Sequence, residues 1–107
     1  MKEGDPVWIV LAVGDEIYSV WVTKELALAD ADAFAKRVAS RSAAKAGVNG
    51  FEHGVRILDL GGLGFDVQGA RYMDLEGHPM WESVTTISVC GIKVQGDAIS
   101  ALASVIV

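Results

Sequence analysis

The sequence is poor in cysteine, in basic residues and in long apolar segments. Its single cysteine, Cys90, cannot form an intramolecular disulfide, which excludes a secreted disulfide scaffold and favours a reducing compartment. Cys90, His53 and His78 do not show the ligand spacing of a zinc site. The longest apolar run, Val7–Val13, is far shorter than the ~20 residues of a membrane helix. It follows residues of mixed charge and precedes a polar segment, so we expect a cytoplasmic protein without membrane contact.

Basic residues are outnumbered by acidic ones. The chain has nine Lys and Arg against fourteen Asp and Glu, a net charge of −5 and a pI near 4.8. Phosphate contacts need a surplus of cations, so we do not expect direct binding of nucleic acid. Apolar residues are plentiful instead, at 51% with a mean hydropathy of +0.36, which excludes a disordered chain. The length of 107 residues predicts one domain, residues 1–107.

The first β-rich segment predicts a hairpin. Val7–Val13 and Glu16–Val22 are separated by Gly14-Asp15, which is typical of a two-residue turn. In that register Trp8 faces Trp21, and Leu11 faces Tyr18. Both faces are apolar, so either the hairpin is covered on both sides or its tryptophan face meets a partner. The interface candidates on the tryptophan face are Trp8, Val10, Ile17 and Trp21.

An alanine-rich segment predicts one long helix from Thr23 to Gly47. Thr23 suits the N-cap and Gly47 the position after the last turn. Small and apolar side chains recur at helical spacing and predict the face that packs on a sheet. This stripe consists of Ala27, Ala31, Phe34, Ala35 and Val38.

The rest of the chain is predicted to be mostly strand. We expect strands over Val55–Leu60, over Phe65–Leu75 with a break at Gly69, and over Trp81–Val94 with a bend or bulge at Gly91. Residues 97–107 favour a short helix, with a strand as the alternative. The fold class is therefore α+β in the order ββαβββα. It has a hairpin, one long helix, and a mostly antiparallel sheet with three or four further strands.

Catalytic and cofactor motifs are not evident. Gly61-Gly62-Leu63-Gly64 is followed by a strand-like segment rather than a helix, so we interpret it as a hairpin turn and not as a phosphate loop. His53 and His78 lie beside glycines in turns, without a nucleophile motif such as Gly-x-Ser-x-Gly. We therefore expect a protein without cofactor or metal, and favour a non-enzymatic role.

Charged residues form two candidate surfaces. Five carboxylates lie near strand ends and turns, where they either converge on a site or are simply solvated. They are Asp59, Asp66, Asp74, Glu76 and Glu82. Four of the nine basic residues lie late in the predicted helix, which leaves five basic and fourteen acidic residues, or −9, elsewhere. These cations either complement the helix dipole or form a docking point for an acidic partner or a phosphate. They are Lys36, Arg37, Arg41 and Lys45.

Two classes of function fit these features. The first is a small acidic protein-binding module, for example a stoichiometric inhibitor of the immunity or anti-defence type. Its acidic body would favour a basic, nucleic-acid-handling partner. The second is a self-associating protein with a symmetric sheet interface. An enzyme or small-ligand domain, with a pocket between sheet and helix, is a further alternative.

Overall fold

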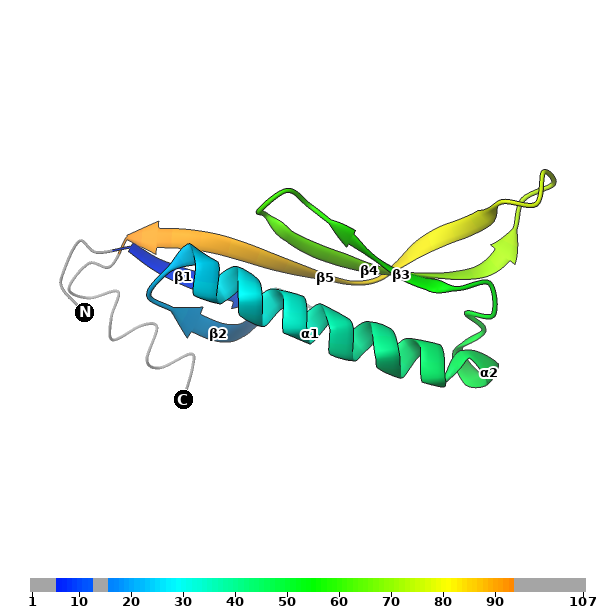
Figure 1. The fold of residues 1–107 in the computed structure, drawn as a ribbon, viewed down its shortest axis with the longest axis horizontal. Coiled ribbons are helices and arrows are strands. Elements are labelled where there is room, and N and C mark those ends of the chain that lie inside the picture. Colours follow the sequence, from blue (N-terminus) through cyan, green and yellow to red (C-terminus); the bar gives the residue numbers. More distant parts are fainter. Residues whose placement is uncertain (1–5, 13–15, 94–107) are drawn as a thin grey trace.

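The computed structural model describes residues 6–12 and 16–93 (Figure 1). The elements follow in the order β1 (Pro6–Leu11), β2 (Ile17–Trp21), α1 (Lys24–Ala44), α2 (Ala46–Asn49), β3 (Val55–Asp59), β4 (Gly64–Met73) and β5 (Pro79–Lys93). This order confirms the α+β class and gives three strands after the hairpin. The predicted turn at Gly14-Asp15 and the predicted helix over residues 97–107 lie outside the described residues.

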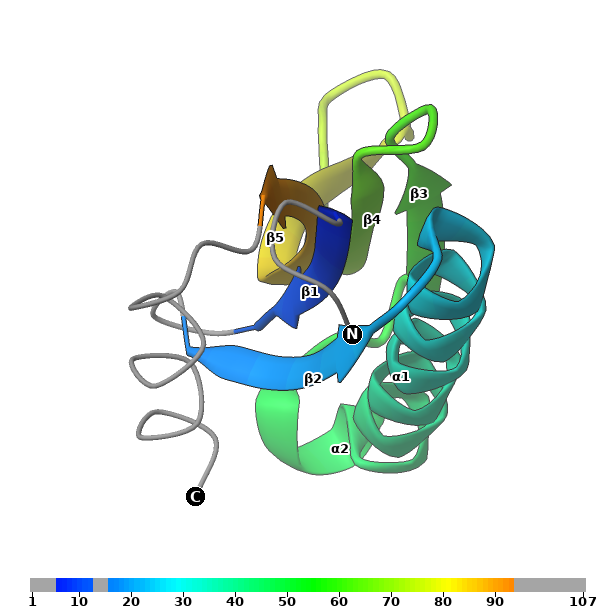
Figure 2. The same ribbon diagram turned by 90° about the vertical axis from the view of Figure 1, so that its left-hand side faces the viewer.

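All five strands form one antiparallel sheet in the order β2-β1-β5-β4-β3. The 15 residues of β5 make it the shared strand, because Pro79–Ser88 pairs with β4 and Ser88–Lys93 pairs with β1. The two parts of the sheet are therefore staggered along β5. Figure 2 shows that the sheet curves around α1, which lies along its concave side. The result is an elongated molecule of 55 × 26 × 18 Å.

The β1–β2 hairpin follows the predicted register only in part. Trp8 pairs with Trp21 as expected, but an irregularity then places Leu11 opposite Ile17 instead of Tyr18. An extra residue in one strand reverses the alternation of side chains beyond it. The prediction that Tyr18 shares a face with Leu11 is therefore wrong. Tyr18 instead packs on the Phe34 ring of α1, with ring centroids 4.4 Å apart.

The long helix begins where the sequence indicates. The Thr23 hydroxyl accepts the backbone N–H of Leu26 at 3.2 Å, so Thr23 is the N-cap. This bond satisfies one of the free N–H groups at the helix start.

The end of the helix differs from the prediction. A second short helix, α2, follows α1 directly, and the left-handed residue that ends it is Gly50, with φ of 84°, rather than Gly47. The Asn49 side chain donates to the carbonyl of Ser42 at 2.8 Å. This bond holds the extra turn against α1, a contact that a propensity pattern does not encode.

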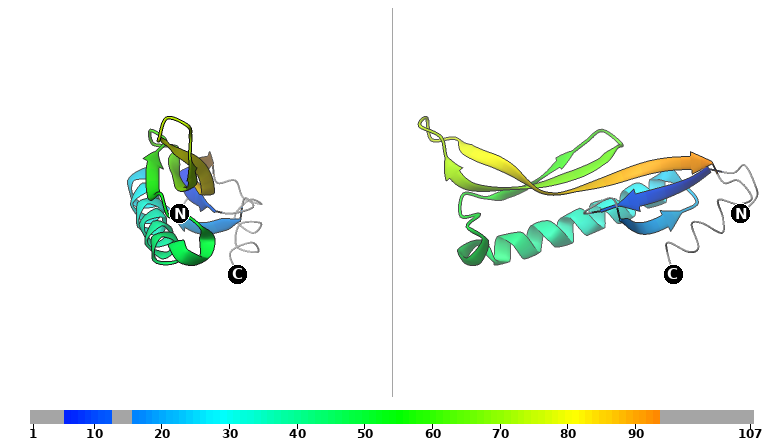
Figure 3. Two further views of the ribbon diagram at one scale, coloured as in Figure 1. Left: turned by 90° about the vertical axis from the view of Figure 1, so that its right-hand side faces the viewer. Right: turned by 180° about the vertical axis from the view of Figure 1, so that it is seen from behind.

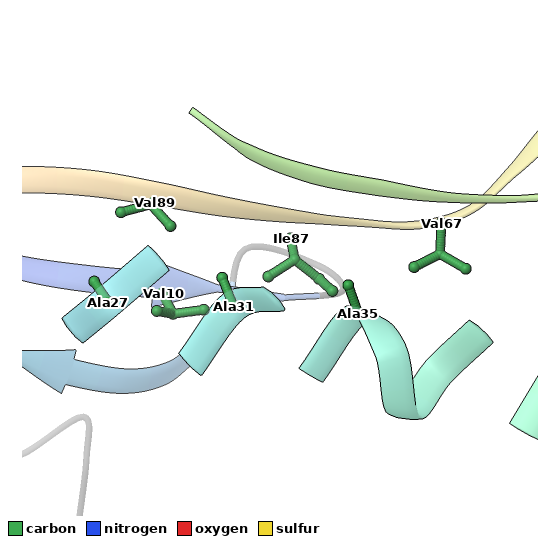
Figure 4. Close-up of a cluster of buried hydrophobic side chains, with 7 residues drawn as sticks. All are labelled: Val10, Ala27, Ala31, Ala35, Val67, Ile87 and Val89. Carbon is green, nitrogen blue, oxygen red and sulfur yellow. The ribbon is translucent and has the colours of Figure 1, made fainter. Parts of the chain in front are cut away.

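The main core lies between α1 and the sheet (Figure 4). Ala27, Ala31 and Ala35 are fully buried, and the small side chains bring the helix axis close to the strands. Burying an aliphatic side chain such as Ile87 contributes about 1.5–3 kcal/mol. This arrangement confirms the predicted stripe. The sheet side of the core consists of Val10, Val67, Ile87 and Val89.

The second face of β1 is also buried. Val7 is 1% exposed and Ile9 is 8% exposed, on the face opposite Val10. They form a second cluster with partly buried residues from β1, β2 and β5, which are Leu11, Val20, Cys90 and Ile92. β1 is therefore buried on both faces, whereas β2, the other strand of the hairpin, lies at the edge of the sheet.

Two glycines in the sheet make room for aromatic rings. A Cβ on Gly69 would lie 2.5 Å from the Phe51 ring, and β4 continues through Gly69 with a register shift on either side. A Cβ on Gly91 would lie 2.8 Å from the Trp8 ring. Of the predicted bend or bulge at Gly91, the bulge is wrong, because β5 pairs with β1 in regular register at this position.

Candidate functional site

The β4–β5 hairpin projects beyond the end of α1 (Figure 1). It carries a group of exposed large apolar side chains. Leu75 is fully exposed, and Tyr72 and Met80 are 66% and 54% exposed. Tyr72 pairs with Met80 across the two strands, so these side chains are neighbours. Single exposed apolar residues are common, whereas clusters mark interaction surfaces. We call this group the apolar tip, and it consists of Tyr72, Met73, Leu75 and Met80.

The turn that carries Leu75 is held in place by Asp74. Its Oδ1 atom accepts the backbone N–H groups of Glu76 and His78, both at 2.9 Å. The backbone N–H of Asp74 donates to the carbonyl of His78 at 2.8 Å, and Gly77 adopts a φ of 86°. Leu75 is thus presented on a hydrogen-bonded turn, which lowers the entropy lost when such a surface binds a partner.

The base of the hairpin is fixed by Arg71. Its Nε atom donates to the carbonyl of Asn49 at 2.8 Å, and its Nη1 atom pairs with Glu82 of β5. The guanidinium also lies 4.6 Å from the centre of the Phe51 ring. Arg71 therefore connects both strands of the hairpin to the segment that contains α2.

Two carboxylates give the tip its charge. Asp74 and Glu76 lie 3.6 Å and 3.7 Å from the Nδ1 atom of His78. All three side chains are exposed. The tip thus combines an apolar surface with two acidic groups, a combination that suits a partner surface with cations around an apolar centre.

Asp66 is the centre of a polar network on the convex face of the sheet. Its carboxylate accepts hydrogen bonds from Ser83 at 2.6 Å, Gln68 at 2.8 Å and Thr86 at 3.0 Å. Burial raises the pKa of Asp66, but these three hydrogen bonds lower it by more, so the pKa lies below its ordinary value. Arg56 donates to Gln68 at 2.7 Å and completes the network. These side chains bond with one another, so the network stabilises this part of the sheet.

The tryptophan face of the hairpin meets α1. Trp8 and Trp21 pack against the main core, and Val10 is fully buried in it. Trp21 donates to the Ser19 hydroxyl at 2.8 Å, and Ser19 donates to Asp30 of α1 at 2.5 Å. The prediction that Ile17 lies on this face is wrong, because the register shift in the hairpin pairs it with Leu11, which belongs to the cluster on the opposite face. The helix of the same chain therefore packs on the tryptophan face, for which a partner was one of the two alternatives.

The four cations of the basic patch are exposed on α1 and directly after it. Lys36 forms an ion pair with Asp32 at 2.8 Å, and Arg37 donates to the Tyr18 hydroxyl at 2.7 Å. Arg41 and Lys45 lie at the end of the helix, beside α2. The end of α1, which carries these last two members of the patch, is at the same end of the molecule as the β4–β5 turn (Figure 3).

The five candidate carboxylates do not converge on one site. Asp59 accepts the Gly61 N–H at 2.8 Å in the β3–β4 turn, and Asp74 holds the turn at the other end of β4. Asp66 bonds with side chains of the sheet and Glu82 pairs with Arg71. Over residues 6–12 and 16–93, His, Cys, Asp and Glu side chains form no group of three that could hold a metal ion.

The tip residues were missed in the sequence because their pattern is short. Tyr72, Met73 and Leu75 precede a Gly-His-Pro turn, and Met80 follows it, so each looks like an ordinary strand residue. The available signal is that apolar residues lie on both sides of a turn. Arg71 was also missed, since its partners lie 11 and 22 residues away.

Comparisons with known proteins give no family for this chain. No family model, no curated protein and no solved structure matches it. In the described part of the chain, no helix has both the length and the apolar character to cross a membrane.

Proposed function

We propose that this chain is a small non-enzymatic protein-binding module that docks through the apolar tip. The observation that carries the proposal is Leu75, fully exposed on a turn that Asp74 holds by two hydrogen bonds. Tyr72 and Met80 are exposed and paired with each other in the strands that flank this turn, and tyrosine is enriched among the residues that dominate binding energy.

The charge of the tip selects a class of partner. Asp74 and Glu76 flank the apolar side chains, and the whole chain carries a net charge of −5. Both features favour a basic surface and increase its rate of association. A stoichiometric inhibitor of a basic, nucleic-acid-handling protein is the specific form we propose, since a narrow projecting hairpin suits insertion into a partner's cleft.

The tip is tested by capture from a lysate of the source cells. We compare the tagged chain with a Leu75→Ser, Met80→Ser double variant. The matched control is Leu63→Ser, because Leu63 is 68% exposed in the other hairpin turn, between β3 and β4. These substitutions are on the surface and change stability by only about 0.5 kcal/mol each.

We expect one basic protein to be recovered by the wild type and by Leu63→Ser, with at least a roughly tenfold loss for the tip variant. A photo-crosslinker at position 75, but not at position 63, should join the chain to that protein. Raising the salt concentration should release it. Equal recovery by the tip variant would overturn the proposal, as would a bound metabolite in native mass spectrometry with no protein partner.

A further inference from the structure

Opposite charges lie at one end of this molecule. The segment from residue 33 to residue 51 contains four cations and no carboxylate, and it ends with α2. The β4–β5 turn carries Asp74 and Glu76 at the same end of the long axis (Figures 1 and 3). Viewed from that end, the turn and α2 lie on opposite sides of the molecule (Figure 3, left).

This placement suits a two-fold axis. In a symmetric dimer each surface patch meets its complement twice, because residue i contacts j and j contacts i. A two-fold axis at this end, across the long axis, brings the acidic turn of each copy to the basic helix end of the other. The two contacts are equivalent by symmetry, so each copy uses both its acidic turn and its basic helix end.

The apolar side chains are complementary as well. Val48 of α2 is 90% exposed and lies three residues after Lys45, and Leu75 is fully exposed between Asp74 and Glu76. Leu75 is therefore next to two carboxylates in the sequence, and Val48 is about one helical turn from a cation. Salt bridges at the rim of an interface contribute little by themselves. The burial of Leu75 and Val48 therefore provides the attraction, and the charges set the orientation of the two copies.

We propose that two copies of this chain form an isologous dimer, in which the apolar tip of each copy docks on the α1–α2 end of the other. Asp74 and Glu76 then face Arg41 and Lys45, and Leu75 packs beside Val48. The proposal rests on the tip being a docking surface, as in the proposed function. A second copy of the chain is then one occupant of the apolar tip, and a different protein must displace that copy in order to bind there.

The charges are tested by a swap. Glu76→Lys places a cation on the tip, and Lys45→Glu places an anion at the helix end, so each single variant sets like charges against each other. The double variant restores opposite charges with reversed direction. Glu25→Lys is the matched control for Glu76→Lys, because Glu25 is an exposed carboxylate at the opposite end of α1 and its reversal changes the net charge by the same amount.

Sedimentation equilibrium of the full chain measures the outcome, with circular dichroism to verify folding. We expect the wild type and Glu25→Lys to approach twice the 11.3 kDa chain mass as concentration rises. Each single reversal should weaken dimerisation by roughly tenfold or more, and the double variant should recover most of the loss. Molar salt should weaken the wild-type dimer as well.

Two results would overturn the dimer. One is a wild type that stays monomeric up to about 1 mM, beyond the range of a specific small interface. The other is a double variant as weak as the two single variants combined. Neither result affects crosslinking of position 75 to a different protein, so the dimer and the proposed function fail separately. A Glu25→Lys variant that also dissociates would indicate a net-charge effect and would likewise reject the proposal.

Discussion

At the scale of the residue, the chemistry of a side chain in this protein depends on the neighbours that the sheet supplies. Asp66 accepts hydrogen bonds from Ser83 and Thr86 of β5, which are 17 and 20 residues away in the sequence. These bonds favour the ionised carboxylate. Asp74, by contrast, bonds with the backbone of its own turn, so its role is local.

The lowered pKa of Asp66 predicts a pH-dependent contribution to stability. A carboxyl group with a depressed folded-state pKa stabilises the fold above its unfolded pKa of about 3.9 and loses that contribution as the pH falls through the folded value. We expect Asp66→Asn to lower the free energy of unfolding by about 1 kcal/mol at pH 7. The difference should shrink below about pH 4. Urea denaturation at several pH values measures it, and a difference independent of pH would contradict the assignment.

At the scale of the element, α1 is defined by its smallest side chains. Ala27, Ala31 and Ala35 are each fully buried, and together they let one helix contact all five strands. Protein interiors are closely packed, so a larger side chain at the centre of this stripe must displace either the helix or the sheet.

Ala31→Leu is therefore expected to destabilise the protein by about 1–3 kcal/mol. Ala43→Leu is the matched control on the same helix, because Ala43 is exposed and leucine has nearly the same helix propensity as alanine. Urea denaturation of both variants compares the free energies of unfolding. Similar values for the two variants would show that α1 does not pack as closely as described.

At the scale of the whole molecule, the stagger of the sheet produces an elongated shape with distinct ends. The Cα radius of gyration is 16.7 Å. A compact domain of this length has a value of about 13 Å. The β1–β2 hairpin lies at one end of the long axis and the β4–β5 turn lies at the other (Figure 1). Leu75 and its neighbours are therefore far from the main core.

Small-angle X-ray scattering checks this shape. The Glu76→Lys variant, as a monomer, should give a radius of gyration near the 16.7 Å of the structure. The wild type should give a larger value as its concentration rises, because an end-to-end dimer extends the long axis. A monomer value of about 13 Å would instead indicate that the hairpin folds back on the body.

The sequence by itself determined the local elements of this protein. The N-cap at Thr23, the alanine stripe of the helix, the glycine turn between β3 and β4 and the α+β class follow from spacing and propensity, which act between residues close in the chain. The cross-strand pair of Trp8 and Trp21 was also predicted, because a short turn fixes the register near it.

Only the tertiary structure decided which surfaces are covered. Periodicity shows that both faces of the first hairpin are apolar, but not that α1 lies on the tryptophan face. The hydrophobic pattern of a strand does not show which distant element of the chain covers it. The same reason hid the tip, since Leu75 resembles a strand residue until the end of α1 is known. The role of Gly69 depends in the same way on Phe51, whose ring reaches it only through the fold.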